Sequence, residues 1–148
     1  MKPLLRILIL ETDANMRLQF AENIRETALR FGRHDVDIDV IECGDVACVL
    51  DSVRDDGDIQ AVILSWSEMP DASSQSRAAL IDEIKSIRLE LPVYVVADDS
   101  RGLEIINEST EIESFFFREE VLTDPEAILG YIINDYDDRS ETPFWTAY

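Results

Sequence analysis

The positions of this chain that matter most for chemistry directly follow its short apolar runs. They are Glu11, Thr12, Asp13, Ser65, Trp66, Ala97 and Arg118. Two carboxylates as close in sequence as Glu11 and Asp13 could hold a weak cation. Carboxylates at the start of a helix more often cap the helix and interact with its dipole. The sequence leaves both interpretations open.

Other reactive side chains are few. His34 is the only histidine and lies in a polar stretch, so a neutral or structural role is favoured over catalysis. Cys43 and Cys48 are the only cysteines, and their spacing suits neither a disulfide framework nor a zinc site. We therefore expect two buried free thiols. The five glycines are isolated, which excludes the glycine-rich phosphate loops of nucleotide-binding proteins and the phosphate loop of flavodoxins.

The net charge of the chain limits the classes of partner that it is expected to bind. Against 13 lysines and arginines stand 32 acidic residues, giving a net charge of −19 over 148 residues. Such a surface repels nucleic acid and anionic membranes, so neither is an expected partner. No apolar run approaches the ~18 residues of a membrane span, and Glu11 interrupts the first run too early for a signal peptide. We expect a cytoplasmic protein.

The elements that must position these side chains can be read from apolar periodicity. Strand-like runs are expected at residues 4–10, 36–41, 59–64, 93–97 and 115–117. The first and third are almost wholly apolar, as central strands are, whereas the second alternates with aspartates, as an edge strand does.

Helical patterns separate the strand-like runs. Asp13 is expected to cap the first helix, whose inner face carries Phe20, Ile24, Ala28 and Phe31 and which Gly32 closes. Gly44 and Asp45 should start a second helix, with Val46, Val49, Leu50 and Val53 turned inward.

The later helices have clear boundaries. A third is expected between a polar loop at 65–75 and Pro92, and a weak one near Leu103. A capping box at 123–126 should open the last helix, which Pro143 should prevent from continuing.

Five strands alternating with helices predict an α/β fold. Right-handed crossovers then give a five-stranded parallel sheet covered on both faces, a flavodoxin-like three-layer sandwich with strand order 2-1-3-4-5. In this architecture a site lies beyond the carboxyl ends of the strands, near the first and third. The positions named at the outset all follow expected strands.

Two motifs resemble the receiver domains of response regulators. They read ILILETDANMR, from Ile7, and AVILSWSEMP, from Ala61, and the likeness extends over residues 4–138. The resemblance implies an aspartate that accepts a phosphoryl group beside a bound Mg²⁺.

This chain departs from the receiver pattern at each required position. The acidic pair becomes Glu11 and Thr12, and the acceptor becomes Ser65 or Trp66. The switch hydroxyl becomes Ala97, and the lysine becomes Arg118. Glu68 is the one nearby carboxylate that could stand in for the acceptor. We predict that the phosphorylation site is lost.

A second resemblance is to the Orn/Lys/Arg decarboxylases. The end of the chain, SETPFWTAY, is similar to the segment entering the pyridoxal-phosphate core of that family, and LELPVYVVADDS is similar to its receiver-like N-terminal "wing" domain. The resemblance implies a parent decarboxylase whose Schiff-base lysine lies in the core. Lys2 and Lys85, the only lysines here, carry no cofactor-pocket signature, so no cofactor is expected in this chain.

The resulting hypothesis is a non-catalytic wing domain at 1–138 and a linker at 139–148 leading to the catalytic core. Its expected partners are that core and other subunits of a homo-oligomer. The candidate interface residues are Trp66, Phe144, Trp145 and Tyr148. The alternative is a stand-alone pseudo-receiver that binds a partner without phosphorylation. The substrate, whether lysine, arginine or ornithine, would be chosen in the core.

Overall fold

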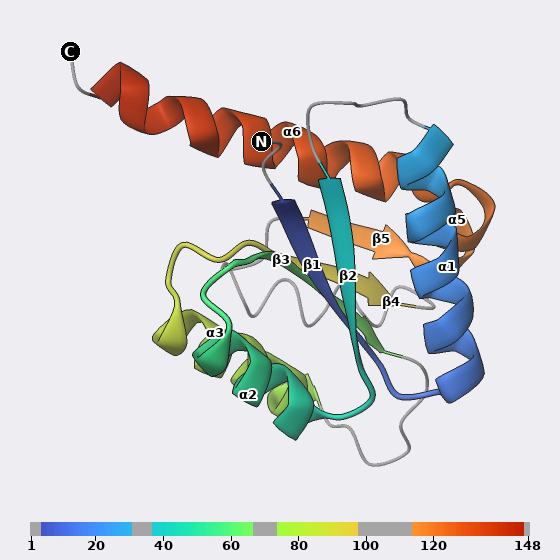
Figure 1. Ribbon diagram of the computed structural model, residues 1–148. Helices are drawn as coiled ribbons and strands as arrows, with labels where there is room; N and C mark the ends of the chain where they lie inside the picture. The colour runs from blue at the N-terminus through green and yellow to red at the C-terminus, as the bar shows by residue number, and fades with distance from the viewer. Residues whose placement is uncertain (1–3, 31–36, 67–73, 98–113, 147–148) are drawn as a thin grey trace.

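One parallel sheet organises the molecule (Figure 1). The computed structural model describes the backbone of residues 4–30, 37–66, 74–97 and 114–146, and most of their side chains. In chain order the elements are β1 (Leu4–Glu11), α1 (Ala14–Arg30), β2 (Asp37–Cys43), α2 (Val46–Asp55), β3 (Ile59–Trp66), α3 (Ser74–Ile87), β4 (Val93–Ala97), β5 (Ser114–Phe117), α5 (Arg118–Thr123) and α6 (Pro125–Thr146). The strand order is β2-β1-β3-β4-β5, which confirms the predicted fold class and topology.

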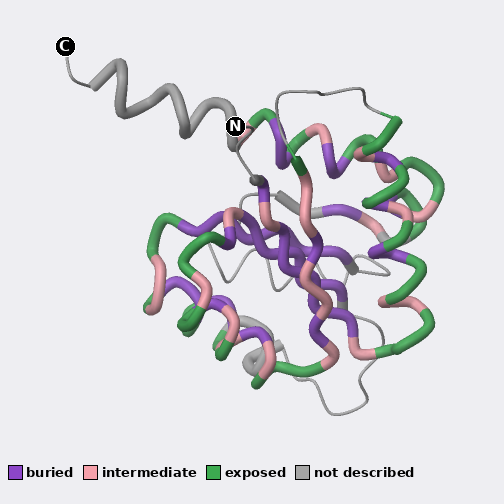
Figure 2. The backbone as a smooth tube through the Cα atoms, viewed as in Figure 1, coloured by how far each residue is buried: buried purple, intermediate pink, exposed green. Residues whose placement is uncertain are grey.

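Helices cover both faces of the sheet, and the strands supply alternate side chains to each face. Leu5, Ile7 and Ile9 of β1 belong to the core shared with α1, α5 and α6. Leu8 and Leu10 belong to the core shared with α2 and α3. Figure 2 shows the buried strands running between the two helical layers. Burial on both faces explains why the runs in β1 and β3 are almost wholly apolar.

Several local predictions are confirmed. β2 lies at the edge of the sheet, as its alternating sequence indicated. The Asp13 carboxylate accepts a hydrogen bond from the Met16 amide at 3.0 Å, and Asp45 caps α2 by accepting from the Cys48 amide at 2.7 Å. The prediction that Val46 turns inward is wrong: Val46 is the first residue of α2 and is exposed, whereas Val49 and Val53 are buried.

The C-terminal third differs from the sequence expectations. α5, which was not predicted, precedes α6. Thr123 ends α5, and its hydroxyl donates to the carbonyls of Glu119 and Glu120 at 2.8 and 3.4 Å, so it does not form the expected capping box. The prediction that Pro143 ends the last helix is wrong, since α6 continues to Thr146. The weak helix expected near Leu103 lies outside the described residues, as do Phe31, Gly32 and His34.

The prediction of free thiols is also wrong. Cys43 and Cys48 form a disulfide with a Cα–Cα distance of 5.5 Å. Cys43 is the last residue of β2, and Cys48 lies in the first turn of α2. The strand-to-helix turn reverses the chain between them, and sequence spacing alone does not reveal that approach.

Arg6, near the amino end of β1, forms ion pairs with residues of two other parts of the chain. Its guanidinium donates to Asp39 of β2 at 3.1 Å and to Asp56, which follows α2, at 2.7 Å. The hydrogen bond to Asp56 raises the pKa of Arg6 above its ordinary value. The two ion pairs fix the start of β1 relative to β2 and α2.

Tyr94 links the sheet to α6 from within the core. Its ring is fully buried in β4, and its hydroxyl donates a hydrogen bond to the partly exposed carboxylate of Asp135 on α6. A buried hydroxyl needs such a partner, and the carboxylate acceptor strengthens the bond. This bond therefore helps to fix where α6 crosses the sheet.

We expect Tyr94→Phe to lower the free energy of unfolding by about 1–3 kcal/mol, because it removes a hydrogen bond to a charged acceptor and leaves the ring in place. Tyr131→Phe is the matched control. The Tyr131 ring, more than half exposed, packs edge-on against Phe116 with centroids 5.6 Å apart, and its hydroxyl removal should change stability by less than about 0.5 kcal/mol. Urea unfolding of the two variants measures both, and equal losses would contradict the role of the Tyr94 hydroxyl.

Candidate functional site

The carboxyl ends of the strands bring the positions singled out in the sequence to one edge. In the strand register, Glu11 lies opposite Ser65, and Trp66 lies opposite Ala97. Arg118 directly follows β5 and opens α5. The backbone thus assembles the positions at the edge where this fold carries its sites.

Glu11 differs from expectation in its burial. Only 1% of its surface is exposed, as is 1% of Ser65. These two neighbouring polar residues are therefore buried at the carboxyl ends of β1 and β3. A carboxylate that caps a helix start or holds a weak cation is expected near solvent, and the burial of Glu11 differs from that expectation. Glu11 is the last residue of β1, which lies between β2 and β3 in the sheet.

Thr12 and Asp13 complete the turn into α1. Thr12 is half-buried and Asp13 is exposed, with one carboxylate oxygen committed to the Met16 amide. This supports the capping role of Asp13. Among the residues that the structure describes, no group of three or more histidine, cysteine, aspartate or glutamate side chains could hold a metal ion. A weak cation between Glu11 and Asp13 stays a prediction.

Arg17 is a site residue whose role the sequence did not reveal. Its Nη1 donates to the backbone carbonyl of Glu11 at 3.0 Å. A Cβ built on Gly44 would lie 2.4 Å from the same nitrogen, so the side chain rests where Gly44 has none. The guanidinium thereby joins the ends of β1 and β2. The arginine of the ETDANMR motif and the glycine after β2 were visible in the sequence, but their contact was not.

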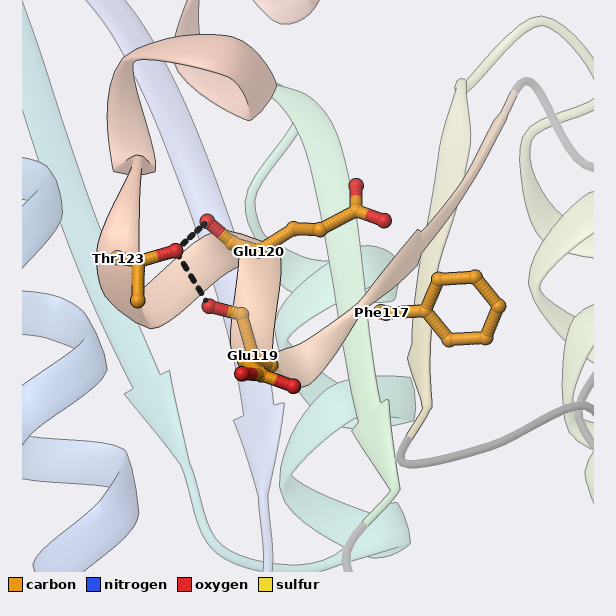
Figure 3. A pocket seen from close by; sticks show the side chains of 4 residues that line it. All are labelled: Phe117, Glu119, Glu120 and Thr123. Atoms are coloured by element: carbon orange, nitrogen blue, oxygen red, sulfur yellow. Dashed lines mark hydrogen bonds between the residues drawn. The ribbon is translucent and has the colours of Figure 1, made fainter.

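A shallow hollow of about 440 Å³ opens beside α5. Phe117, Glu119, Glu120 and Thr123 line it, and Figure 3 shows the Glu120 side chain extending toward the Phe117 side. The Thr123 hydroxyl donates hydrogen bonds to the carbonyls of Glu119 and Glu120 within its own helix, α5. The hollow holds two exposed carboxylates and, among its lining residues, no nucleophile with an adjacent base.

The remaining candidates are placed by backbone alone. Trp66 and Ala97 end β3 and β4, so Trp66 is a strand residue and not part of the predicted loop. Phe144 and Trp145 lie in the last turn of α6. Glu68 and Tyr148 lie outside the described residues. The interface role assigned to Trp66 and the aromatic tail stays a prediction.

Comparison with known proteins gives one family. The family described as Orn/Lys/Arg decarboxylase, N-terminal domain, matches residues 20–135. No curated protein matches the chain. None of the helices in the described parts of the chain has the length and apolar character needed to span a membrane.

Solved structures share the fold. An adenylate cyclase from Rhodopirellula baltica is 17% identical with a TM-score of 0.70, over 99% of this chain and 98% of that one. A response regulator receiver domain protein from Clostridium thermocellum is 16% identical with a TM-score of 0.62, over 90% and 97%. A response regulator receiver protein from Pseudomonas putida is 16% identical with a TM-score of 0.64, over 91% and 98%. The predicted receiver-like fold is confirmed.

We expect no aspartyl-type phosphorylation of this chain. Acetyl phosphate and Mg²⁺ should leave the intact mass unchanged, because neither Ser65 nor Trp66 supplies a carboxylate nucleophile. A receiver domain with its acceptor aspartate, treated in parallel, is the positive control. A gain of one phosphoryl group that Glu11→Gln or Glu68→Gln abolishes would contradict the predicted loss of the site.

Gly44→Ala tests the Arg17 contact. The new methyl group should displace the guanidinium from the Glu11 carbonyl and lower the free energy of unfolding by about 0.5–1.5 kcal/mol. Gly57→Ala is the matched control, since a Cβ there meets nothing within 4 Å, and it should leave stability unchanged or raise it by up to about 1 kcal/mol. In an Arg17→Ala background the cost of Gly44→Ala should disappear. The same cost in both backgrounds would show that the clash lies elsewhere.

Proposed function

Because this chain belongs to the family of Orn/Lys/Arg decarboxylase N-terminal domains, we propose that it is the non-catalytic assembly domain of a PLP-dependent basic amino-acid decarboxylase of the cytoplasm. The family match over residues 20–135 is the observation that carries the proposal. The domain would hold the catalytic core and neighbouring subunits in place, and the parent would perform the lyase reaction elsewhere. Its substrate would be lysine, arginine or ornithine.

The described residues do not fit pyridoxal phosphate. Lys85 is the one lysine among them, and it is buried with its Nζ donating to the carbonyl of Leu91 at 2.7 Å. The Leu89 carbonyl lies 3.5 Å from the same nitrogen. A Schiff-base lysine must present its amine to the cofactor aldehyde, whereas Lys85 ties the end of α3 to the start of β4. This arrangement supports a cofactor site in the core and not in this domain.

The direction of α6 supports attachment to a further domain. Figure 1 shows the C-terminal half of this helix projecting beyond the sheet and the other helices. Phe144 and Trp145 belong to the projecting part. Aromatic residues carried outward on a helix suit anchoring in a partner surface. We propose that this part of the helix leads to the core.

Exposed apolar side chains on α1 offer a second contact. Leu18 and Leu29 are 51% and 84% exposed, and they lie eleven residues apart, about three helical turns, on one side of the helix, with the exposed Glu22 and Arg25 between them. The net charge of −19 opposes close approach of two copies of this domain alone. The proposed occupant of this surface is therefore the decarboxylase core, with a neutral or basic contact region.

The second candidate function is a stand-alone pseudo-receiver. Its support is the similarity to receiver structures, which at 16% identity concerns the fold alone. A pseudo-receiver would use the same strand ends to bind a signalling partner. A pseudo-receiver would need neither a PLP core nor a projecting helix. The coding sequence after the codon for Tyr148 therefore distinguishes the two proposals.

We expect the coding sequence to continue past the codon for Tyr148 into a PLP core, and the encoded enzyme to form an oligomer. Leu18→Asp with Leu29→Asp should then shift the sedimenting species to smaller assemblies, because charges would enter an apolar contact. Leu89→Asp is the control, since Leu89 is 72% exposed and follows α3 on the opposite face of the sheet. A stop codon directly after Tyr148 would eliminate the decarboxylase proposal, and unchanged assembly of the double variant would remove α1 from the interface.

A further inference from the structure

The two cysteines of the chain meet at the same edge of the sheet as the candidate site. Cys43 ends edge strand β2, and Cys48 is the third residue of α2. Their Cα atoms are 5.5 Å apart, within the Cα–Cα range usual for disulfides. The segment between them contains Gly44, on which Arg17 rests, and Asp45, the cap of α2.

This disulfide stabilises the fold less than a long-range bridge would. The bridged residues are only five positions apart, and closing so short a loop removes less entropy from the unfolded chain than closing a long one. The elements on either side of the turn are held without the bridge, since β2 pairs with β1 through Cys43 and the Asp45 carboxylate caps α2. Cys43 is also packed in the core shared with α2 and α3. A bridge over a short loop costs less stability to open than a long-range bridge, so it is suited to opening and closing.

The two sulfurs differ in their access to solvent. Cys43 is 1% exposed and lies near the Ser52 hydroxyl at 3.8 Å, whereas Cys48 is only partly buried. Thiol–disulfide exchange proceeds by direct attack of one sulfur on another, so access decides which cysteine reacts first. The partly exposed Cys48 meets an external reagent, and the buried Cys43 lies within reach to displace it.

We propose that Cys43 and Cys48 form a reversible thiol–disulfide site that a low-molecular-weight disulfide oxidises and that sets the state of the turn between β2 and α2. In the first step the Cys48 thiol attacks the disulfide reagent, which gives a mixed disulfide at Cys48 and releases one thiol. In the second step Cys43 attacks the Cys48 sulfur, which gives the protein disulfide and releases the second thiol. Two protein thiols are thus oxidised, one external disulfide is reduced, and two protons pass to the two released thiols.

The consequence of the bridge lies in the residues it encloses. Arg17 connects the Gly44 turn to the carbonyl of Glu11, so a bridge that holds the turn also holds the support of the β1 end. Reduction frees the turn to move about the cap of α2. The site therefore couples the redox state of two cysteines to the edge at which the sheet presents Glu11 and Ser65. This inference does not depend on the decarboxylase proposal.

Glutathione buffers of graded oxidation test the proposal on the purified chain. Native protein should lose both alkylatable thiols in oxidising buffer and regain both in reducing buffer, without unfolding as judged by circular dichroism. The amide of Cys48 should exchange hydrogen more slowly in the oxidised form. A disulfide that reduced glutathione opens only in denaturant would overturn reversibility, and equal exchange in the two forms would overturn control of the turn.

Two single variants establish the order of the steps. Cys43→Ser should accumulate a mixed disulfide with one glutathione at Cys48, at a rate at least about tenfold above that of Cys48→Ser, because access limits the exchange. Both variants keep a side chain of similar size, and their circular dichroism spectra serve as the folding control. Faster reaction of Cys48→Ser would overturn the assignment of Cys48 as the entry point.

Discussion

Burial of the sheet on both faces is the constraint on which the rest of the molecule depends. β1 and β3 lie between two helical layers, so their apolar side chains from Leu5 to Leu10 and from Ala61 to Leu64 enter one core or the other. Polar groups have no place there without partners, and they collect where the strands end. Glu11 and Ser65, opposite each other at the end of β1 and β3, mark this transition from core to edge. The location of the candidate site follows from the packing of the sheet and does not require a functional explanation of its own.

The sequence predicted those parts of the structure that local rules determine. The apolar run of β1, the alternation of β2, and the capping aspartates Asp13 and Asp45 each carry their own physical signal, and each is found as expected. α5 was missed because its six residues are too few to establish helical periodicity. Pro143 was read as a helix end because it lacks an amide hydrogen, although α6 continues through it.

The sequence predicts where the candidate site lies in the fold, but not the contacts and burial of its side chains. Alignment of parallel strand ends was enough to bring Glu11, Ser65 and Ala97 to one edge. The burial of Glu11, the contact of Arg17 with Gly44 and the pairing of the cysteines depend on how turns fold back over that edge. The residues in these contacts are not spaced at the helical or strand period, so hydrophobic periodicity does not predict that they meet. The fixed positive charge of Arg17 at the turn is consequently a property that only the three-dimensional arrangement reveals.

The length of α6 has a mechanical consequence. Its 22 residues span about 33 Å as a single rod, of which the first half is packed on the sheet. Tyr94 holds the rod at Asp135, near its middle, so this hydrogen bond acts as a fulcrum. By geometry, a tilt of the packed half about this point would be enlarged at the C-terminal end, and a load applied at that end would act on the core of the sheet as a torque. A helix held in this way has the geometry of a lever arm.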